Sequence, residues 1–242
     1  MRQKVRKALL IIALLLFPVT IWYFSPVLIM QAASEHIING SFIVFVAMFV
    51  LSVFFGRAWC GYLCPAGGLQ ECVGMVNGKP AKQGWRDRIK YVIWILWMAG
   101  VITTFVLGKN DVTVNPFFMT DHGISVAQIF DYIVYYGVVC LLFIPAIVHG
   151  KRAACHYICW MAPFMIIGST IGRWLHLPQL HVEADKESCI ACGRCSKVCP
   201  MGLDAKEMVA SGKHSMCSEC IQCGACIDEC PKKVLKYKWL WK

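Results

Sequence analysis

Cysteine is the residue type in this chain best suited to chemistry, and nine of the fifteen cysteines lie between residues 189 and 230. They fall in two runs with one spacing, Cys-x2-Cys-x2-Cys-x3-Cys-Pro, which begins at Cys189 and again at Cys220. Thiolates are soft ligands that hold iron–sulfur clusters or zinc. Three thiolates at every third residue of a tight loop can bind three irons of one cubane. The two runs therefore predict a pair of metal centres.

The spacing of the two runs is typical of bacterial two-cluster ferredoxins, in which the fourth cysteine of each run binds the other cluster. We therefore predict two [4Fe–4S] clusters, the first with the ligands Cys189, Cys192, Cys195 and Cys230, and the second with the ligands Cys220, Cys223, Cys226 and Cys199. Crossed ligation of this kind also holds together a domain that is too short to have a large core of its own.

Structural zinc is the alternative for these runs, because cysteine pairs with this spacing also bind zinc. Two complete runs that each end in x3-Cys-Pro favour the clusters, and a reducing compartment disfavours a disulfide framework. Cys217 stands three residues before Cys220 and offers a competing first ligand. The x3-Cys-Pro ending favours Cys220, so we interpret Cys217 as a spare thiol.

Four further cysteines lie in a weak internal repeat in the first two thirds of the chain. The pattern Arg-Ala-x-Cys-x-Tyr-x-Cys occurs at residues 57–64 and again at 152–159. Cysteines four residues apart share one face of a helical turn, so two converging pairs would form a four-sulfur site. We predict an additional iron–sulfur or zinc centre with the ligands Cys60, Cys64, Cys155 and Cys159.

Two other interpretations of these four cysteines remain open. They can form redox-active disulfides, or they can be buried as small hydrophobic side chains, which is common for cysteine. Arg57 and Arg152 open the two repeats and would offset the negative charge of thiolate ligands. The same arginines are equally suited to anchor the cytoplasmic ends of membrane helices. Cys72 and Cys140 stand alone, and we expect them to be packing residues.

The composition is that of a membrane protein, with 58% hydrophobic and 16% charged residues. Four apolar stretches approach the length of a membrane-spanning helix, at 8–30, 37–56, 91–108 and 125–148. We expect Pro18 and Pro26 to kink the first of them. A fifth stretch at 157–172 is shorter, and we expect it to be interfacial or re-entrant.

The predicted fold class is therefore a mainly α membrane protein. Residues 1–177 form a bundle of four transmembrane helices, built from two repeated hairpins with their cysteine pairs at the cytoplasmic face. Residues 178–242 form a cytoplasmic α+β domain of the two-[4Fe–4S] ferredoxin type. We expect the alternating aromatic and basic tail at 237–242 to rest on the membrane interface.

Lysine and arginine predict the orientation through the positive-inside rule. The N-terminal tail and residues 57–90 and 151–152 are basic, whereas the stretches 31–36 and 109–124 carry only Lys109. Both termini are therefore expected in the cytoplasm of a bacterium, with the chain in the inner membrane and lipid around it. The net charge of +10 comes mainly from these basic segments. The sequence contains no recognition motif for nucleic acid, so the charge does not predict a nucleic-acid-binding protein.

The segment from Gly56 to Glu71, GRAWCGYLCPAGGLQE, resembles the G-R-x-W-C-G-W-x-C-P-x-G-x-L-Q-E segment of the NapH/NosR-type membrane polyferredoxins. The C-terminal runs extend the resemblance over nearly the whole chain, and the layout is most similar to NapH, the membrane component of a quinol dehydrogenase. Trp160 follows Cys159 where that family usually has proline. The resemblance implies oxidation of quinol, electron transfer through 4Fe–4S clusters, and an iron–sulfur or cytochrome partner.

The sequence thus predicts a membrane protein that exchanges electrons between the quinone pool and a redox partner, and that is a candidate quinol dehydrogenase component. A maturation reductase for a partner metalloenzyme, which reduces a metal or thiols, is the alternative. Ionisable residues near membrane faces are functional candidates by default. His36, His122 and Asp131 lie near the outer face, where a quinol would release protons, and His149 and His156 lie on the inner side. All five are also suited to be ordinary interface residues.

Iron content tests the cluster prediction directly. We expect two cubanes to give about eight iron atoms per chain, and a third centre to raise that value. The measurement is iron and zinc analysis of the purified, brown-coloured protein. A colourless chain that contains zinc in place of iron would contradict the prediction.

Overall fold

Two helices in the described part of the chain are long and apolar enough to cross a membrane. The computed structural model describes residues 1–108, 111–211 and 217–240. The two helices are α7 (Ile89–Leu107), which the 3-10 helix η2 (Trp85–Arg88) precedes, and α8 (Ile129–His149). They match the third and fourth predicted spans. A third span exists if the bent stretch from Arg2 to Phe24 is counted as one.

The first predicted span is interrupted near both of its prolines. It begins as α1 (Arg2–Leu15), bends by 60° into α2 (Phe17–Thr20) and the 3-10 helix η1 (Ile21–Phe24), and resumes as α3 (Pro26–Ser34). Pro18 lies in the first turn of α2 and Pro26 begins α3. At these positions the missing N–H costs no helical hydrogen bond. The predicted kinks are confirmed, but residues 8–30 do not form one continuous helix.

The second predicted span is shorter than expected. Its first residues form β1 (Ile37–Asn39), which pairs in parallel with β2 (Thr113–Asn115), and α4 (Gly40–Phe55) follows. The Asn39 side chain accepts a hydrogen bond of 3.0 Å from the backbone N–H of Phe42 and fixes the start of this helix. With 16 residues, α4 is about 24 Å long. The described chain is therefore mainly helical with two or three candidate spans.

The internal repeat is present in the backbone as well as in the sequence. α5 (Ala58–Tyr62) and α9 (Ala153–Tyr157) each contain five residues and begin directly after the repeat arginine. The residues that end them, Leu63 and Ile158, both have a φ of −123°. A longer helix follows each, α6 (Pro65–Val76) in the first repeat and α10 (Ala162–Trp174) in the second. The sequence did not predict α6, whereas α10 agrees with the short helix predicted at 157–172.

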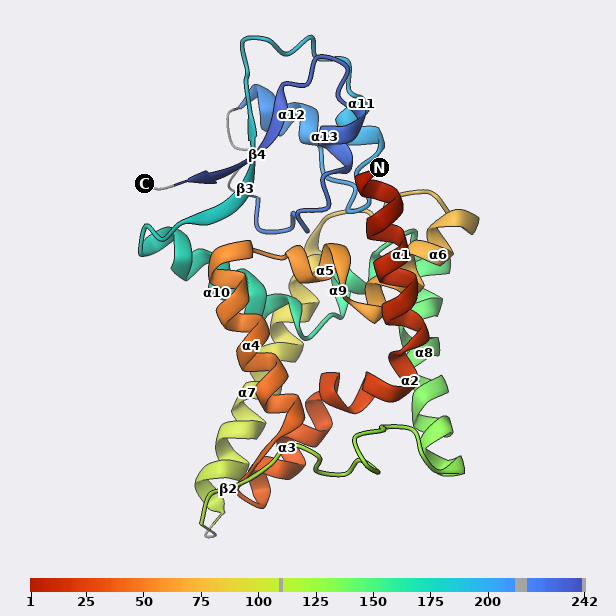
Figure 1. The fold of residues 1–242 in the computed structure, drawn as a ribbon, viewed down its shortest axis with the longest axis vertical. Coiled ribbons are helices and arrows are strands. Elements are labelled where there is room, and N and C mark those ends of the chain that lie inside the picture. Colours follow the sequence, from red (N-terminus) through yellow and green to blue (C-terminus); the bar gives the residue numbers. More distant parts are fainter. Residues whose placement is uncertain (109–110, 212–216, 241–242) are drawn as a thin grey trace.

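The helices that follow the two repeats are exchanged between the halves of the molecule. α10 packs along α4, whereas α6 packs against α8 and α1. Two groups of helices result, one of α4, α7 and α10 and the other of α1, α6 and α8 (Figure 1). Small residues permit the close approach, because a Cβ on Gly168 would lie 2.7 Å from the carbonyl oxygen of Phe49. Both cysteine pairs lie at the same end of the bundle, because α4 and α8 end there directly before α5 and α9 (Figure 1).

The C-terminal residues form a small domain that lies on this end of the helices (Figure 1). Its antiparallel sheet pairs β3 (Gln179–Ala184) with β4 (Leu235–Leu240). The short helices of this domain are α11 (Arg194–Lys197), α12 (Ala205–Ala210) and α13 (Ala225–Glu229).

The tail adopts a structure that the sequence did not specify. Its alternating residues form β4, since alternation is also the pattern of a strand with two different faces. The Trp239 ring lies 5.5 Å from the ring of Phe55, at the end of α4. The tail is therefore part of the C-terminal sheet up to Leu240, and Trp241 and Lys242 lie outside the described residues.

A glycine allows the C-terminal domain to contact the helices directly. A Cβ on Gly61 in α5 would collide with the carbonyl oxygen of Ile221 and lie 3.6 Å from the Cα of Cys223. From α1, the Gln3 side chain donates a hydrogen bond of 3.0 Å to the carbonyl oxygen of Cys223. The second cysteine run and the first cysteine repeat are thus in van der Waals contact.

We expect Gly61→Ala to loosen this contact, because the interface has no room for one more methyl group. The expected cost is about 1–3 kcal/mol of stability, measured as a lower Tm of the purified protein in detergent. The matched control is Gly137→Ala in α8, where an added Cβ meets nothing within 4 Å. An equal loss of stability in both variants would contradict close packing of the C-terminal domain against Gly61.

Candidate functional site

The predicted ferredoxin cysteines surround two separate hollows in the C-terminal domain. Residues from β4 and α11 close the first hollow, and residues from α12 and α13 close the second. The first hollow is lined by Cys189, Cys192, Cys195 and Cys230, and the second by Cys199, Cys217, Cys220, Cys223 and Cys226. Each predicted ligand set thus shares one hollow, including the fourth cysteine from the other run. Cys217, which we interpreted as spare, also faces the second hollow.

The two cysteine loops have matching backbones, which explains why three cysteines in each point inward. Ala191 and Gln222 occupy equivalent positions and have φ values of 50° and 55°. Gly193 and Gly224 follow two residues later, with φ values of 73° and 69°. Left-handed residues at these places turn the chain tightly around a centre. The sequence carries this signal only in the two glycines, since a side chain rarely adopts the left-handed region.

Both hollows fit an iron–sulfur cluster in their donor chemistry. The rest of the second hollow is apolar, and the first is otherwise lined by apolar residues and by Arg194, Lys206 and Lys232. Cations do not bind metal, so sulfur is the main donor that both hollows offer. Burial raises the pKa of Cys199 to about 11 and that of Cys226 to about 12. These groups therefore stay protonated until a metal displaces the protons. Among the described residues, no group of three His, Cys, Asp or Glu side chains converges as a single-ion site.

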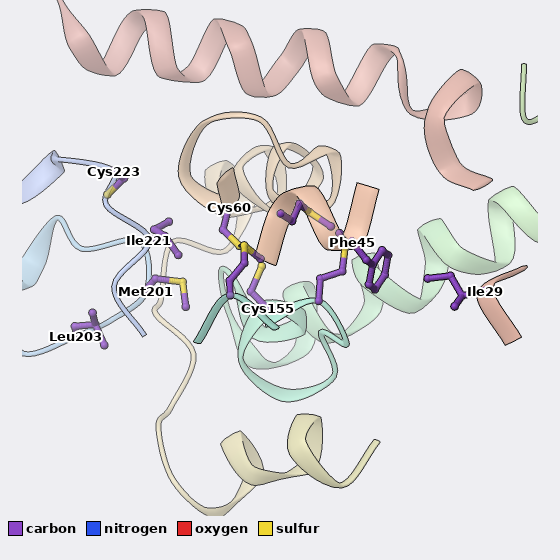
Figure 2. Packing of buried hydrophobic residues seen from close by; sticks show 11 residues of the cluster. Ile29, Phe45, Cys60, Cys155, Met201, Leu203, Ile221 and Cys223 are labelled. Atoms are coloured by element: carbon purple, nitrogen blue, oxygen red, sulfur yellow. The ribbon is translucent and has the colours of Figure 1, made fainter. Parts of the chain in front are cut away.

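The four membrane cysteines meet at one cavity. Cys60, Cys64, Cys155 and Cys159 all line a space of about 470 Å³ that extends along the inside of the helices. The Sγ atom of Cys60 lies 3.8 Å from the Sδ atom of Met165. Figure 2 shows Cys60 and Cys155 directed toward each other, with Ile221 between them and Cys223 and with Met201 beside Cys155. The structure therefore brings the two pairs together, as the repeat predicts.

A buried glutamine fixes one of these thiols. The Gln70 side chain is fully buried and donates a hydrogen bond of 3.1 Å to the Sγ atom of Cys155. Its Oε1 atom accepts hydrogen bonds from the backbone N–H groups of Ala154 and Cys155, at 3.0 and 3.3 Å. Gln70 from the first repeat therefore holds the start of α9 in the second.

The two repeat arginines lie beside the membrane cysteines, and each is only 1% exposed. The Nη1 atom of Arg152 donates to the carbonyl oxygen of Cys60 at 3.0 Å, and that of Arg57 donates to the carboxylate of Glu219 at 2.8 Å. The Nε atoms of both arginines, and Nη2 of Arg57, are buried without a hydrogen-bond partner in the described structure. Unpaired buried donors beside thiols fit a negatively charged, thiolate-ligated group.

Two glutamates balance these arginines, and they come from different parts of the chain. Glu71 in α6 accepts from Arg152 at 3.1 Å and forms an ion pair of 2.5 Å with Arg6. Burial opposes ionisation of Glu71, but its hydrogen bonds and the charges of the two arginines outweigh this effect and lower its pKa to about 2. In the second repeat, α10 contains no carboxylate. Glu219 of the C-terminal domain instead supplies the carboxylate that pairs with Arg57.

Lys90 completes this cross-domain charge cluster. Its side chain is fully buried, and its Nζ atom lies 2.6 Å from Glu219 Oε1. Sequence reasoning missed Lys90, Glu71 and Glu219. Glu71 and Gln70 lie within the segment on which the family resemblance depends, whereas nothing in the local sequence pairs Glu219 with the membrane residues.

The three outer candidates have ordinary contacts in this structure. The Nε2 atom of His36 lies 2.7 Å from the carbonyl oxygen of Phe105, and Nδ1 of His122 lies 2.7 Å from the Asp121 carboxylate. Asp131 accepts hydrogen bonds of 2.9 and 3.2 Å from backbone N–H groups before α8 and so caps that helix. Only Asp131 of the three lines the cavity that contains the membrane cysteines.

The two inner histidines differ in burial. His149 is exposed at the end of α8, and its ring lies 5.9 Å from the ring of Tyr157. His156 is fully buried, with Nε2 3.0 Å from the carbonyl oxygen of Met201 and Nδ1 3.3 Å from Asp87. Burial lowers the pKa of His156. These contacts make His156 a link between α9 and the C-terminal domain.

The two isolated cysteines are not part of either site. Cys72 is half-buried in α6. Cys140 is exposed on α8, so the prediction that it packs inside the protein is wrong. An apolar stretch that spans a bilayer can carry an outward-facing cysteine, and periodicity alone did not distinguish the two faces of α8.

Comparisons with known proteins agree with the cysteine geometry. A family model described as a 4Fe-4S binding domain matches residues 40–83, which include Cys60 and Cys64, and one described as a 4Fe-4S dicluster domain matches residues 181–231. The chain is 25% identical over 199 residues to the "Putative electron transport protein YccM" of Escherichia coli (strain K12). The alignment covers 74% of this chain and 50% of that relative, so the chain spans half of its length. No solved structure matches the chain significantly.

The matched domains bind 4Fe–4S clusters, and they include both C-terminal runs and the first membrane repeat. The second repeat, with Cys155 and Cys159, lies outside both matched segments. The individual ligand assignments stay predictions.

We expect Glu219→Gln to destabilise the protein by about 3 kcal/mol, because it leaves Arg57 and Lys90 buried without a counter-charge. Denaturant unfolding in detergent, followed by tryptophan fluorescence, measures the loss. The matched control is Glu183→Gln, which removes an exposed ion pair of 3.0 Å with Lys238. That pair should contribute less than about 1 kcal/mol. Similar losses in the two variants would show that the buried cluster has no special role.

Proposed function

We propose that this protein is a membrane-bound electron carrier that exchanges electrons between the quinone pool and a redox partner through 4Fe–4S clusters. It resembles the NapH-type components of quinol dehydrogenases in this respect. When bound, the clusters supply one-electron chemistry. The chain's own residues hold them, insulate them and set the charge around them.

The observation that carries this proposal is the contact between the second cysteine hollow and the membrane cysteines. Ile221 lies between Cys223 and Cys60 in Figure 2, and all three belong to one packed cluster. A Cβ on Gly61 would collide with the carbonyl oxygen of Ile221. An apolar, closely packed junction of this kind keeps water away from both sites. It supports a continuous line of centres from the membrane to the C-terminal domain.

The four membrane cysteines are proposed to hold a third iron–sulfur centre at the start of this line. Arg57 and Arg152 have buried N–H groups without a hydrogen-bond partner, and these groups can stabilise the negative charge of the centre. Hydrogen bonds and cations near the sulfur atoms raise the reduction potential of such a centre. The first hollow lies at the other end, where Cys192 and Ile190 are exposed. A soluble iron–sulfur or cytochrome partner would exchange electrons there.

The proposed location is the bacterial inner membrane, with both termini in the cytoplasm. Four crossings would include α4 and the bent stretch of α1 to η1 in addition to α7 and α8. The basic residues at the end that carries the C-terminal domain support this orientation.

A maturation reductase is the second candidate, and the methionines near the membrane cysteines favour it. Met48, Met161 and Met165 are buried in the same cluster as Cys60 and Cys155. Thioether and thiolate groups together are soft ligands that select metals such as Cu(I). In this role the clusters would reduce a metal or thiols of a partner enzyme, and quinol would not be a substrate.

The experiment that separates the two candidates is cluster reduction by quinol. We expect purified protein in nanodiscs to show reduced-cluster signals in low-temperature EPR after addition of a water-soluble quinol analogue, without further reductant. Dithionite provides the full-reduction control. A protein that dithionite reduces but several quinol analogues do not would exclude quinol oxidation and favour the maturation role.

A further inference from the structure

The cavity beside the membrane cysteines is much longer than a metal site requires. Along α8 its wall runs from Asp131 to Leu142, which corresponds to about 16 Å of helix. Its volume of about 470 Å³ is that of a pocket for a small organic molecule. The four thiols occupy only one part of its lining.

The lining of this cavity selects an apolar, flat ligand. Aromatic side chains from the broken first span and from the loop after α9 form its walls, and these are Phe17, Trp22, Phe24 and Trp160. Rings of this kind stack against planar groups. Few polar groups accompany them, chiefly the Ser25 hydroxyl, the Gln70 amide and the Asp131 carboxylate.

Part of the cavity lining is exposed on the outer surface of α8, which would face lipid. Val134 and Leu141 line it and are each 49% exposed in the isolated chain. The kink between α1 and α2, which Pro18 supports, places Phe17 and Ile21 on the opposite wall. The half-exposed side chains of α8 mark the place where a ligand dissolved in the bilayer would reach the cavity.

We propose that this cavity binds an isoprenoid quinone, with the ring between the aromatic walls and the first part of the tail directed toward lipid. The inference rests on the proposed function and assigns a place to its lipid-soluble substrate. Asp131 is the carboxylate of the lining and can accept a hydrogen bond from a hydroxyl of the quinol form. The thiols of the membrane cysteines lie in the same cavity, so the ligand and the proposed third centre are neighbours.

An azido-quinone photoprobe tests the site on the holoprotein in nanodiscs. We expect mass spectrometry to locate the label in peptides that contain residues 17–28 and 131–142. Val138→Trp fills the middle of the cavity and should reduce labelling at least fivefold. Ile133→Trp is the matched control, because Ile133 lies on the same helix, is 67% exposed and does not line the cavity. It should change labelling less than twofold.

A second variant keeps the test independent of packing. Asp131→Asn keeps the shape of the side chain and an oxygen that can cap α8. We expect it to weaken binding of the quinol form at least threefold more than that of the quinone form. Unchanged labelling in Val138→Trp, or label confined to other peptides, would overturn the proposal. The proposal would also be overturned if an acyl-chain photoprobe labelled the same peptides and added quinone did not reduce that labelling.

The outcomes also separate this inference from the proposed function. If quinol reduces the clusters equally well in wild type and Val138→Trp, the site is elsewhere and the electron-transfer function stands. If quinol reduces neither while dithionite reduces both, the proposed function fails, and the labelling pattern alone decides whether the cavity binds a quinone.

Discussion

The constraint on which this structure depends is the burial of cations beside thiols. Arg57, Arg152 and Lys90 are all nearly inaccessible, and buried charge is tolerated only when it is paired. The membrane repeats supply one carboxylate, Glu71, and the C-terminal domain supplies the other, Glu219. The position of the cysteine-rich domain on the helices is thus fixed by charge as well as by the fit at Gly61. Without Glu219, Arg57 and Lys90 would have no carboxylate partner among the described residues.

The packing of α6 and α10 fixes the relative positions of the two cysteine pairs at the end of the bundle that contacts the C-terminal domain. α10 packs against α4 of the first repeat, whereas α6 packs against α8 of the second repeat and also against α1. Gln70 from the first repeat then reaches the thiol of Cys155 in the second, and Arg152 of the second reaches the carbonyl of Cys60 in the first. These two hydrogen bonds join the cysteine pair of one repeat to that of the other. Such cross-links suit a site to which each repeat contributes two ligands.

Much of this arrangement is readable from the sequence, and the parts that are not have physical reasons. Spacing identifies the ferredoxin runs because ligand geometry is local, and the repeated Arg-Ala-x-Cys pattern predicts the convergence of Cys60 and Cys155. Hydropathy finds α7 and α8 but overestimates the first two spans, since two prolines break one and Asn39 delays the other. The pairing of Glu219 with Arg57 joins residues 162 positions apart, and no local pattern encodes such a contact. The exposure of Cys140 likewise depends on which face of α8 meets protein.

Glu219 lies late in the sequence, and this position has a consequence for the order in which the protein folds during synthesis. The ribosome releases residues 57 and 90 long before the last quarter of the chain, so Arg57 and Lys90 are made before their carboxylate exists. Until the cysteine-rich segment folds, those cations must stay hydrated or contact lipid phosphate. Folding of that segment is therefore the step that pairs both cations with Glu219 and buries them at the end of the helices.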